Sequence, residues 1–498
     1  MRKLHIIYLI LVLFFFCSVE GYAKGSSSAE KSLQESISKL IKDDAFSQAV
    51  ISICAMTSDG KKIVDINSSK MLLPASNMKL ISSGAAIHKL GADHRFETSI
   101  GYDGSIENGV LKGNIYIIGG GDPTLGSIDT IAVSLDKVFA QWESMISKAG
   151  IKKIEGRIIG DGRSFEGMME EPTWLWNDVG TYYGTGTSGL MFYENMQSFA
   201  VEPGDSLGAP IKISPSYPHT PWMEFRYDCS TGKNGTGDKL YMYTSELAPV
   251  AVVRGTFGLD RGKKRVDCSN KYPEYTCAYY FVNYLKKKGI ECTQGAGDYK
   301  FDTNWKRRGN VRILGKTYSP TLDRIVFETN HASNNLYAET LMRGLSLKMT
   351  GSACYDSAYV AMDKVLKGMG LTLKEVAIQD GSGLSRQNYV SAHFFCRFLK
   401  AMMSSPHFKA YEASLPSPGG RGTLNYNMKN YPASVRKRIL VKSGSMNGVR
   451  CYSGYIIPTE GGKDDYIIFS IMVNNCNAPN WKIRPLLDKI MGTLAGLN

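Results

Sequence analysis

The stretch that decides how the chain is interpreted runs Pro-Ala-Ser-Asn-Met-Lys-Leu-Ile-Ser-Ser-Gly-Ala-Ala-Ile, from Pro74 to Ile87. If this stretch is helical, Ser76 and Lys79 lie on one face, with roughly 5–6 Å between their Cβ atoms. The amine can then reach the hydroxyl, which puts a nucleophile beside a base. The small apolar residues after Lys79 predict a buried helix, whose first turn directs unpaired backbone N–H groups outward, where they can bind an oxyanion.

The Ser-x-x-Lys spacing alone is not selective, because it also occurs at Ser28, Ser36, Ser134 and Ser230. Only Ser76 follows an expected β-hairpin, with one strand over residues 49–56, a turn at Asp59-Gly60 and a second strand over residues 61–66. The other four serines lie in polar or weakly patterned surroundings. Context therefore selects Ser76 as the candidate nucleophile.

The N-terminus has the pattern of a secretory signal peptide. Arg2 and Lys3 precede an apolar run over residues 4–16, and small residues end at Ala23, so we expect cleavage that removes residues 1–23. Cys17 offers the less favoured alternative of a lipid anchor, because bulky phenylalanines precede it. No other stretch reaches the ~18 apolar residues of a membrane span. The mature protein is therefore expected to be exported.

Composition and charge narrow the class of protein. Hydrophobic residues make up 43% and charged residues 21% of the chain, as in globular proteins. The net charge of +13 suits contact with anionic envelope polymers or a membrane surface, and equally an ordinary basic secreted protein. The basic run over residues 261–265 lacks the interleaved aromatic residues of a nucleic-acid surface, so no nucleic-acid partner is expected.

Cysteines and histidines give no sign of a metal site, because the sequence has no C-x-x-C or H-E-x-x-H pair. We assign neither a metal nor a cofactor. Four cysteines fall between Cys229 and Cys292, where one or two disulfides or buried free thiols are both open.

The rest of the chain divides by pattern. Short β-like runs separated by Gly, Pro and Asn fill residues 96–312. Helices are then predicted over residues 322–328, 335–347, 356–366 and 391–403, the last with Ser391 as N-cap. Strands follow over residues 438–442, 450–457 and 465–474, and a last helix over residues 482–497 has Pro485 in its first turn.

These elements predict an α+β fold. Two N-terminal and three C-terminal strands would form a five-stranded antiparallel sheet flanked by helices. One domain then comprises residues 24–95 and 313–498, and residues 96–312 are a strand-rich insertion with two subdomains.

Two further motifs complete a constellation around Ser76. Ser333-Asn334-Asn335 opens a predicted helix, and Lys442-Ser443-Gly444-Ser445 ends a predicted strand. The ordered S-x-x-K, S-x-N and K-[ST]-G motifs resemble those of penicillin-binding proteins and serine β-lactamases. This resemblance implies the transpeptidase domain of those proteins, with its helical subdomain.

Three other stretches, over residues 120–125, 380–386 and 422–424, resemble class C low-molecular-mass penicillin-binding proteins, the S13 peptidases. The resemblance covers essentially the whole mature chain. The family contains D-alanyl-D-alanine carboxypeptidases and endopeptidases, which implies a periplasmic enzyme acting on peptidoglycan stem peptides and cross-links, with β-lactams as covalent inhibitors. One departure is Ser443, where the family usually has threonine.

The resemblance also implies roles. Ser76 would attack the carbonyl between two D-alanines and form an acyl-enzyme, while Lys79 takes its proton. Ser333 would relay a proton to the leaving group, and Asn335 would hold Lys79 and the substrate amide. A free lysine has a pKa of about 10.4, so Lys79 must be desolvated or must face another cation, for which Lys442 is the candidate.

The third motif would hold the substrate's terminal carboxylate through Lys442 and Ser443, with Gly444 beside them. Backbone N–H groups of Ser76 and Ser445 would form the oxyanion hole.

Asp161 and Arg386 lie in family-like stretches and could together grip the zwitterionic end of a diaminopimelate side chain, or be structural ion pairs. Two other functions stay open: a non-catalytic muropeptide-binding envelope protein, and a serine β-lactamase. The latter is less favoured because no E-x-x-L-N element follows Ser333.

Overall fold

The computed structural model describes residues 28–299 and 310–496, so the predicted signal peptide and Cys17 lie outside the described residues. A central sheet has the strand order β2-β1-β23-β22-β21, and every neighbouring pair is antiparallel. Its strands are β1 (Val50–Thr57), β2 (Lys62–Ile66), β21 (Ile439–Met446), β22 (Val449–Ile456) and β23 (Ile467–Asn474). The predicted five-stranded antiparallel sheet is confirmed.

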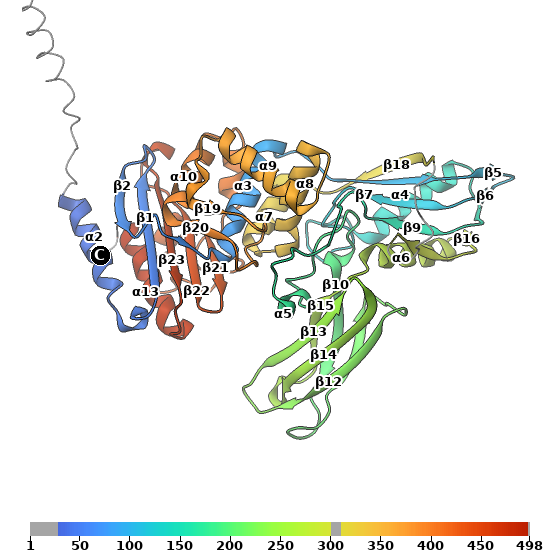
Figure 1. The fold of residues 1–498 in the computed structure, drawn as a ribbon, viewed down its shortest axis with the longest axis horizontal. Helices are drawn as coiled ribbons and strands as arrows, with labels where there is room; N and C mark the ends of the chain where they lie inside the picture. The colour runs from blue at the N-terminus through green and yellow to red at the C-terminus, as the bar shows by residue number, and fades with distance from the viewer. Residues whose placement is uncertain (1–27, 300–309, 497–498) are drawn as a thin grey trace, which may run out of the picture.

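Both faces of this sheet are buried, because successive residues of a strand point to opposite sides. Ile53 belongs to a core that includes residues of α2 (Ser28–Leu40) and α13 (Asn480–Leu494). Its neighbour Cys54 belongs to a second core, which includes residues of α10 (Ala392–Met403). The sheet is thus a central layer between two layers of helices (Figure 1).

A helical subdomain packs on the α10 side of the sheet (Figure 1). Ser391 caps α10 as predicted, since its Oγ accepts a 2.9 Å hydrogen bond from the N–H of Phe394. A small sheet, β19-β20-β3, borders the helices. The elements are α3 (Met78–Leu90), α7 (Leu322–His331), α8 (Asn335–Thr350), α9 (Tyr355–Gly368), α11 (Phe408–Ala413), β3 (Met71–Leu72), β19 (Val376–Ala377) and β20 (Tyr389–Ser391). The short helix α12 (Ala433–Arg436) packs on the opposite face, where Val435 joins the core of α2 and α13.

The inserted region leaves and re-enters this domain at one point. The N–H of Ser319 donates to the carbonyl of Phe96 at 2.9 Å, and the N–H of Phe96 donates to Ser319 Oγ at 2.9 Å. Beyond this junction the inserted region extends to the right in Figure 1 as two lobes.

The upper lobe contains the sheets β17-β9-β7-β4-β18 and β16-β8-β6-β5, packed with two helices. Its elements are β4 (Glu97–Tyr102), β5 (Ser105–Glu107), β6 (Val110–Lys112), β7 (Ile115–Gly119), α4 (Leu135–Lys148), β8 (Lys153–Ile154), β9 (Ile158–Asp161), α6 (Pro273–Lys287), β16 (Glu291–Cys292), β17 (Ala296–Asp298) and β18 (Arg312–Tyr318).

The lower lobe contains the sheets β11-β10-β15 and β12-β14-β13, and α5 (Trp176–Val179) lies beside β13 (Figure 1). Its strands are β10 (Met196–Glu202), β11 (Lys212–Tyr217), β12 (Glu224–Gly232), β13 (Asp238–Ser245), β14 (Ala248–Gly258) and β15 (Lys264–Ser269).

The structure corrects three sequence expectations. The insertion also carries α4 and α6, although Val138, Trp142 and Ile146 of α4 already had helical spacing in the sequence. Its sheet extends to Tyr318, past the boundary expected at 312, because β18 pairs with β4. Pro485 lies inside α13 and not in its first turn, because that helix begins at Asn480.

The cysteines between 229 and 292 are free thiols. Cys268 lies in the core of the lower lobe and Cys277 in the core of the upper lobe. Of the two alternatives, disulfides or free thiols, the described residues therefore show buried or half-buried free thiols.

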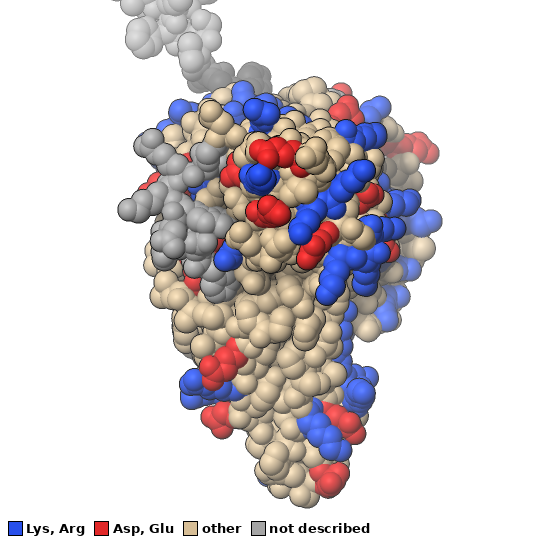
Figure 2. Space-filling view, turned by 90° about the vertical axis from the view of Figure 1, so that its right-hand side faces the viewer, with Lys and Arg blue, Asp and Glu red and all other residues tan. Residues whose placement is uncertain are grey.

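On the face that Figure 2 shows, Lys and Arg are most frequent on the right-hand side, with Asp and Glu interspersed among them, and the middle of the face carries few charged residues. Over residues 28–299 and 310–496, no helix combines the length and apolar character that crossing a membrane requires.

Candidate active site

Ser76 lies in a 3-10 turn, Ala75–Asn77, which leads directly into α3. Lys79 occupies the first turn of α3, is fully buried, and has its Nζ 2.9 Å from Ser76 Oγ. Ala75 has a left-handed φ of 46°, and a Cβ on Gly383 would come within 1.8 Å of the Ala75 carbonyl oxygen. The backbone of the turn that carries Ser76 is therefore strained at Ala75, and the absence of a side chain at Gly383 leaves room for it.

Two fixed acceptors flank the Lys79 amine. Its Nζ donates to Asn335 Oδ1 at 2.6 Å and to the Ser382 carbonyl at 2.8 Å. Burial lowers the pKa of Lys79 to about 7, although the carboxylates of Asp380 and Glu339 oppose the shift. The neutral amine is therefore well populated at neutral pH. Burial, the first of the two causes anticipated from sequence, dominates this shift.

Both acceptors are themselves held. Asn335 begins α8, and its Nδ2 donates to the Tyr183 carbonyl of the inserted region at 2.8 Å. The N–H of Ser382 donates to Glu339 Oε1 at 2.7 Å. Burial and the neighbouring Asp380 raise the pKa of Glu339 to about 8. Glu339 and the Tyr183 carbonyl thus orient the groups that contact Lys79.

Lys442 faces the second motif. Its fully buried Nζ donates to Ser333 Oγ and to the Ser443 carbonyl, both at 2.9 Å. Burial and the charge of nearby Lys79 lower the pKa of Lys442 well below its usual range. Ser443 Oγ lies 2.8 Å from Thr423 Oγ1, so the third motif presents two hydroxyls beside the buried lysine.

The third motif lies at the end of its strand as predicted, although β21 runs to Met446 and not only to the expected residue 442. Gly444 lets this strand approach the serine turn, since a Cβ there would lie 2.6 Å from the Pro74 carbonyl oxygen. The approach brings Ser445 to the same cleft as Ser76. That cleft has a volume of about 570 Å³, and Ser333, Asn335 and Thr423 also line it.

Arg386 lines the same cleft, whereas Asp161 does not. Asp161 is fully buried in β9 of the upper lobe and pairs with Arg163 at 3.0 Å. Of the two alternatives, a structural ion pair is therefore confirmed for Asp161, and a joint substrate grip by Asp161 and Arg386 is wrong. The cleft instead contains Asp178, whose pKa is raised by burial, although the hydrogen bond from Tyr183 and the charge of Arg386 oppose the shift. The acidic group facing Arg386 therefore comes from α5.

Sequence reasoning missed Asp178, Tyr183, Ser382 and Glu339. Glu339 had a usable signal, because it follows Asn335 by one helical turn and lies on the same face of α8. Tyr183 and Ser382 contribute backbone carbonyls, which leave no trace in residue identity.

The sheet, the helical subdomain and the two buried lysines beside serine hydroxyls define a class of protein, the penicillin-recognising serine hydrolases. Within that class, the chain belongs to the D-Ala-D-Ala carboxypeptidase 3 (S13) family, whose sequence profile matches residues 33–491. It is therefore a serine peptidase, as predicted, and the non-catalytic alternative is set aside.

Similar proteins agree with this assignment. A D-alanyl-D-alanine carboxypeptidase from an Actinomadura species is 26% identical over 472 residues, covering 92% of this chain and 84% of that protein. D-alanyl-D-alanine carboxypeptidase DacB of Haemophilus influenzae is 22% identical over 422 residues, covering 82% of each chain. The crystal structure of penicillin binding protein 4 (dacB) from Haemophilus influenzae superposes with a TM-score of 0.77 at 20% identity, covering 92% of this chain and 98% of that one. The predicted fold class is confirmed.

Proposed function

We propose that this chain is an exported D-alanyl-D-alanine carboxypeptidase that acts on peptidoglycan stem peptides through an acyl-enzyme on Ser76. The observation that carries the proposal is the set of three oxygens around Lys79 Nζ: Ser76 Oγ, Asn335 Oδ1 and the Ser382 carbonyl. A neutral amine has two N–H donors and one lone pair. Two of these oxygens can only accept, so they take the N–H groups and leave the lone pair for the Ser76 hydroxyl.

Acylation then follows from the geometry. Lys79 removes the Ser76 proton as the oxygen attacks the carbonyl carbon of the penultimate D-alanine. The N–H groups of Ser76 and Ser445 stabilise the oxyanion. When the intermediate collapses, the C–N bond breaks, and the leaving D-alanine nitrogen takes a proton from Ser333 Oγ, which Lys442 replenishes across 2.9 Å. Water then attacks the ester carbonyl and gives one proton to Lys442, while the Ser76 oxygen leaves as a hydroxyl with the proton that Lys79 held, so both lysines return to their starting states.

Substrate recognition is assigned to two parts of the cleft. Lys442, together with the hydroxyls of Ser443 and Thr423, suits the terminal carboxylate. Asp178 and Arg386 offer opposite charges to a zwitterionic side chain such as that of diaminopimelate. The same subsites would accept a cross-linked peptide, so cleavage of cross-links is the second activity to test.

The deciding experiment is intact-protein and peptide mass spectrometry after incubation with benzylpenicillin. We expect one penicilloyl adduct, located on Ser76 and absent from Ser76→Ala. A missing adduct, or one on another residue, would refute the assignment. D-Alanine release from a pentapeptide and monomer release from a cross-linked dimer then separate carboxypeptidase from endopeptidase activity, and sustained nitrocefin turnover would instead indicate a β-lactamase.

Export to the periplasm rests on the predicted signal peptide over residues 1–23. N-terminal sequencing of the mature protein should begin at Lys24. A lipid-modified N-terminus at Cys17 would establish anchoring instead.

A further inference from the structure

The inserted region supplies one backbone atom to the active site. The Asn335 side chain spans two partners, with Nδ2 donating to the Tyr183 carbonyl at 2.8 Å and Oδ1 accepting from Lys79 at 2.6 Å. A primary amide has an accepting end and a donating end. The Tyr183 carbonyl therefore decides which end of Asn335 faces the base. If the amide turned over, Nδ2–H would compete for the Lys79 lone pair that Ser76 needs.

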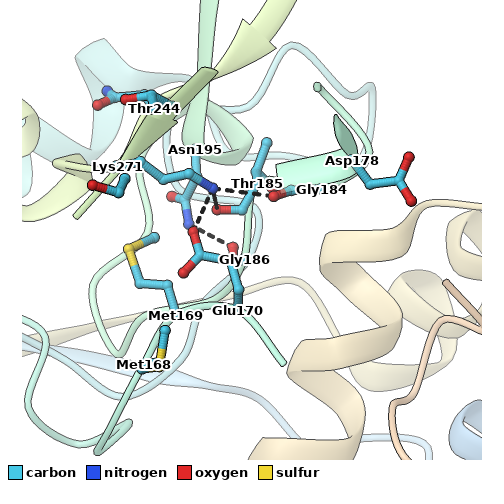
Figure 3. A network of polar contacts seen from close by, with 12 residues as sticks. Met168, Met169, Glu170, Asp178, Gly184, Thr185, Gly186, Asn195, Thr244 and Lys271 are labelled. Atoms are coloured by element: carbon cyan, nitrogen blue, oxygen red, sulfur yellow. Dashed lines mark hydrogen bonds and ion pairs between the residues drawn. The ribbon is translucent and has the colours of Figure 1, made fainter. Parts of the chain in front are cut away.

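A buried polar network holds the segment that follows Tyr183 (Figure 3). Lys271 Nζ donates to the carbonyls of Gly184 at 3.1 Å and Thr185 at 3.2 Å, and pairs with Glu170 at 2.5 Å. The side chain of Lys271 is fully buried and that of Glu170 is 7% exposed. Three separate segments of the inserted region thus meet at one ammonium group, one residue beyond the carbonyl that Asn335 needs.

A second buried cation ties the same region to the helix that carries Asn335. Arg343 of α8 donates to the Thr187 carbonyl at 3.0 Å and to the Met168 carbonyl at 3.2 Å. These atoms lie on the two segments that Lys271 joins. Arg343 therefore links the helix that carries Asn335 to the segments that carry its acceptor, and Lys271 links those segments to each other.

A buried ion pair is a poor source of net stability, because apolar residues of similar volume often stabilise as well or better. The pair can instead fix the positions of nearby carbonyl groups, because a buried ammonium group is costly unless its hydrogen-bond acceptors stay in place. We propose that Glu170 and Lys271 are positioning residues, which hold the Tyr183 carbonyl so that Asn335 presents oxygen to Lys79. This inference rests on the proposed function.

The test is the pH dependence of benzylpenicillin acylation by Glu170→Leu/Lys271→Met, a double variant that replaces the pair with apolar residues. The maximal acylation rate should fall by about 10- to 100-fold, the scale of a small misplacement of reacting groups. An acceptor stabilises the charged form of Lys79, so losing Asn335 Oδ1 should move the acid limb of the profile to lower pH. The other charged groups around Lys79, namely Glu339 of α8, Asp380 of the glycine loop and Lys442 of β21, are unchanged.

Leu111→Ala is the matched control, because Leu111 is fully buried in the upper lobe and takes no part in the network. It should lower the melting temperature without moving the acid limb. If the double variant does not fold, Glu170→Gln replaces it and should shift the limb in the same direction by less.

A folded double variant with the wild-type rate and acid limb would overturn the positioning role. So would an acid limb that Leu111→Ala moves equally. Failure of wild-type protein to acylate on Ser76 would instead refute the proposed function itself, so the two failures are distinguishable.

Discussion

Two regions form the active-site cleft, and they contribute different kinds of groups to it. One is the domain built on the central sheet, and the other is the inserted region. The first provides side chains, namely Ser76, Lys79, Ser333 and Lys442, each on or beside a regular element. The second provides Asp178 at the rim and a carbonyl at Tyr183. The difference teaches that reacting groups can sit in one region while their orientation is set by another.

The largest expected effect removes the nucleophile. Ser76→Ala should lower benzylpenicillin acylation and D-alanine release by roughly 10⁴-fold or more, since no other group can carry the acyl chain. Stopped-flow acylation and mass spectrometry measure it. Ser134→Ala is the control, because Ser134 has the same spacing to a lysine but lies in the inserted region at the start of α4. A comparable loss in that variant would contradict the conclusion that the reacting side chains lie outside the inserted region.

Lys442→Gln should lower D-alanine release by about 10²-fold, because one charged donor to the substrate carboxylate and one proton source are lost. Wild-type acylation should follow the deprotonation of Lys79, with an acid limb near its pKa of about 7. Removing a neighbouring positive charge favours the protonated form of Lys79, so the limb should move to higher pH, each unit corresponding to about 1.4 kcal/mol. Unchanged rates and an unmoved limb would show that the third motif has been misplaced.

Asp178→Asn tests whether the carboxylate at the edge of the cleft takes part in substrate recognition. We expect KM for a diaminopimelate-containing peptide to rise about tenfold, the scale of one lost charge-assisted contact. Acylation by benzylpenicillin should stay unchanged, because that small inhibitor lacks the zwitterionic side chain. Asp161→Asn is the control, and its folded form should keep the wild-type KM, since Asp161 pairs with Arg163 away from the cleft. Equal effects of the two variants would remove Asp178 from substrate recognition.

Ser443→Thr should have the smallest effect. The hydroxyl that meets Thr423 is retained, so kcat/KM should change by about twofold at most, as for substitutions that remove no special feature. Steady-state kinetics with a pentapeptide checks this. A large gain would show that the methyl group of the usual threonine contributes to substrate binding.

Sequence reasoning predicted the central sheet, the S13 resemblance and the catalytic motifs, because each rests on side-chain identity or hydrophobic periodicity. It paired Asp161 with Arg386 wrongly, because two residues from distant stretches carry no sign of being neighbours. The structure brings Asp178 there instead. The carbonyls of Tyr183 and Ser382 could not be found, since any residue can supply a carbonyl and only the path of the chain selects one.

At the junction of Phe96 and Ser319 the two chain crossings are hydrogen-bonded to each other, which makes the inserted region removable by engineering. Ends so close can be joined by a short turn, and modules with adjacent termini are those that chains gain, lose and exchange most readily. A shortened enzyme made this way would retain every residue of the three motifs. It would lack the Tyr183 carbonyl that accepts from Asn335 Nδ2, so we expect such an enzyme to keep its three motifs and still acylate slowly.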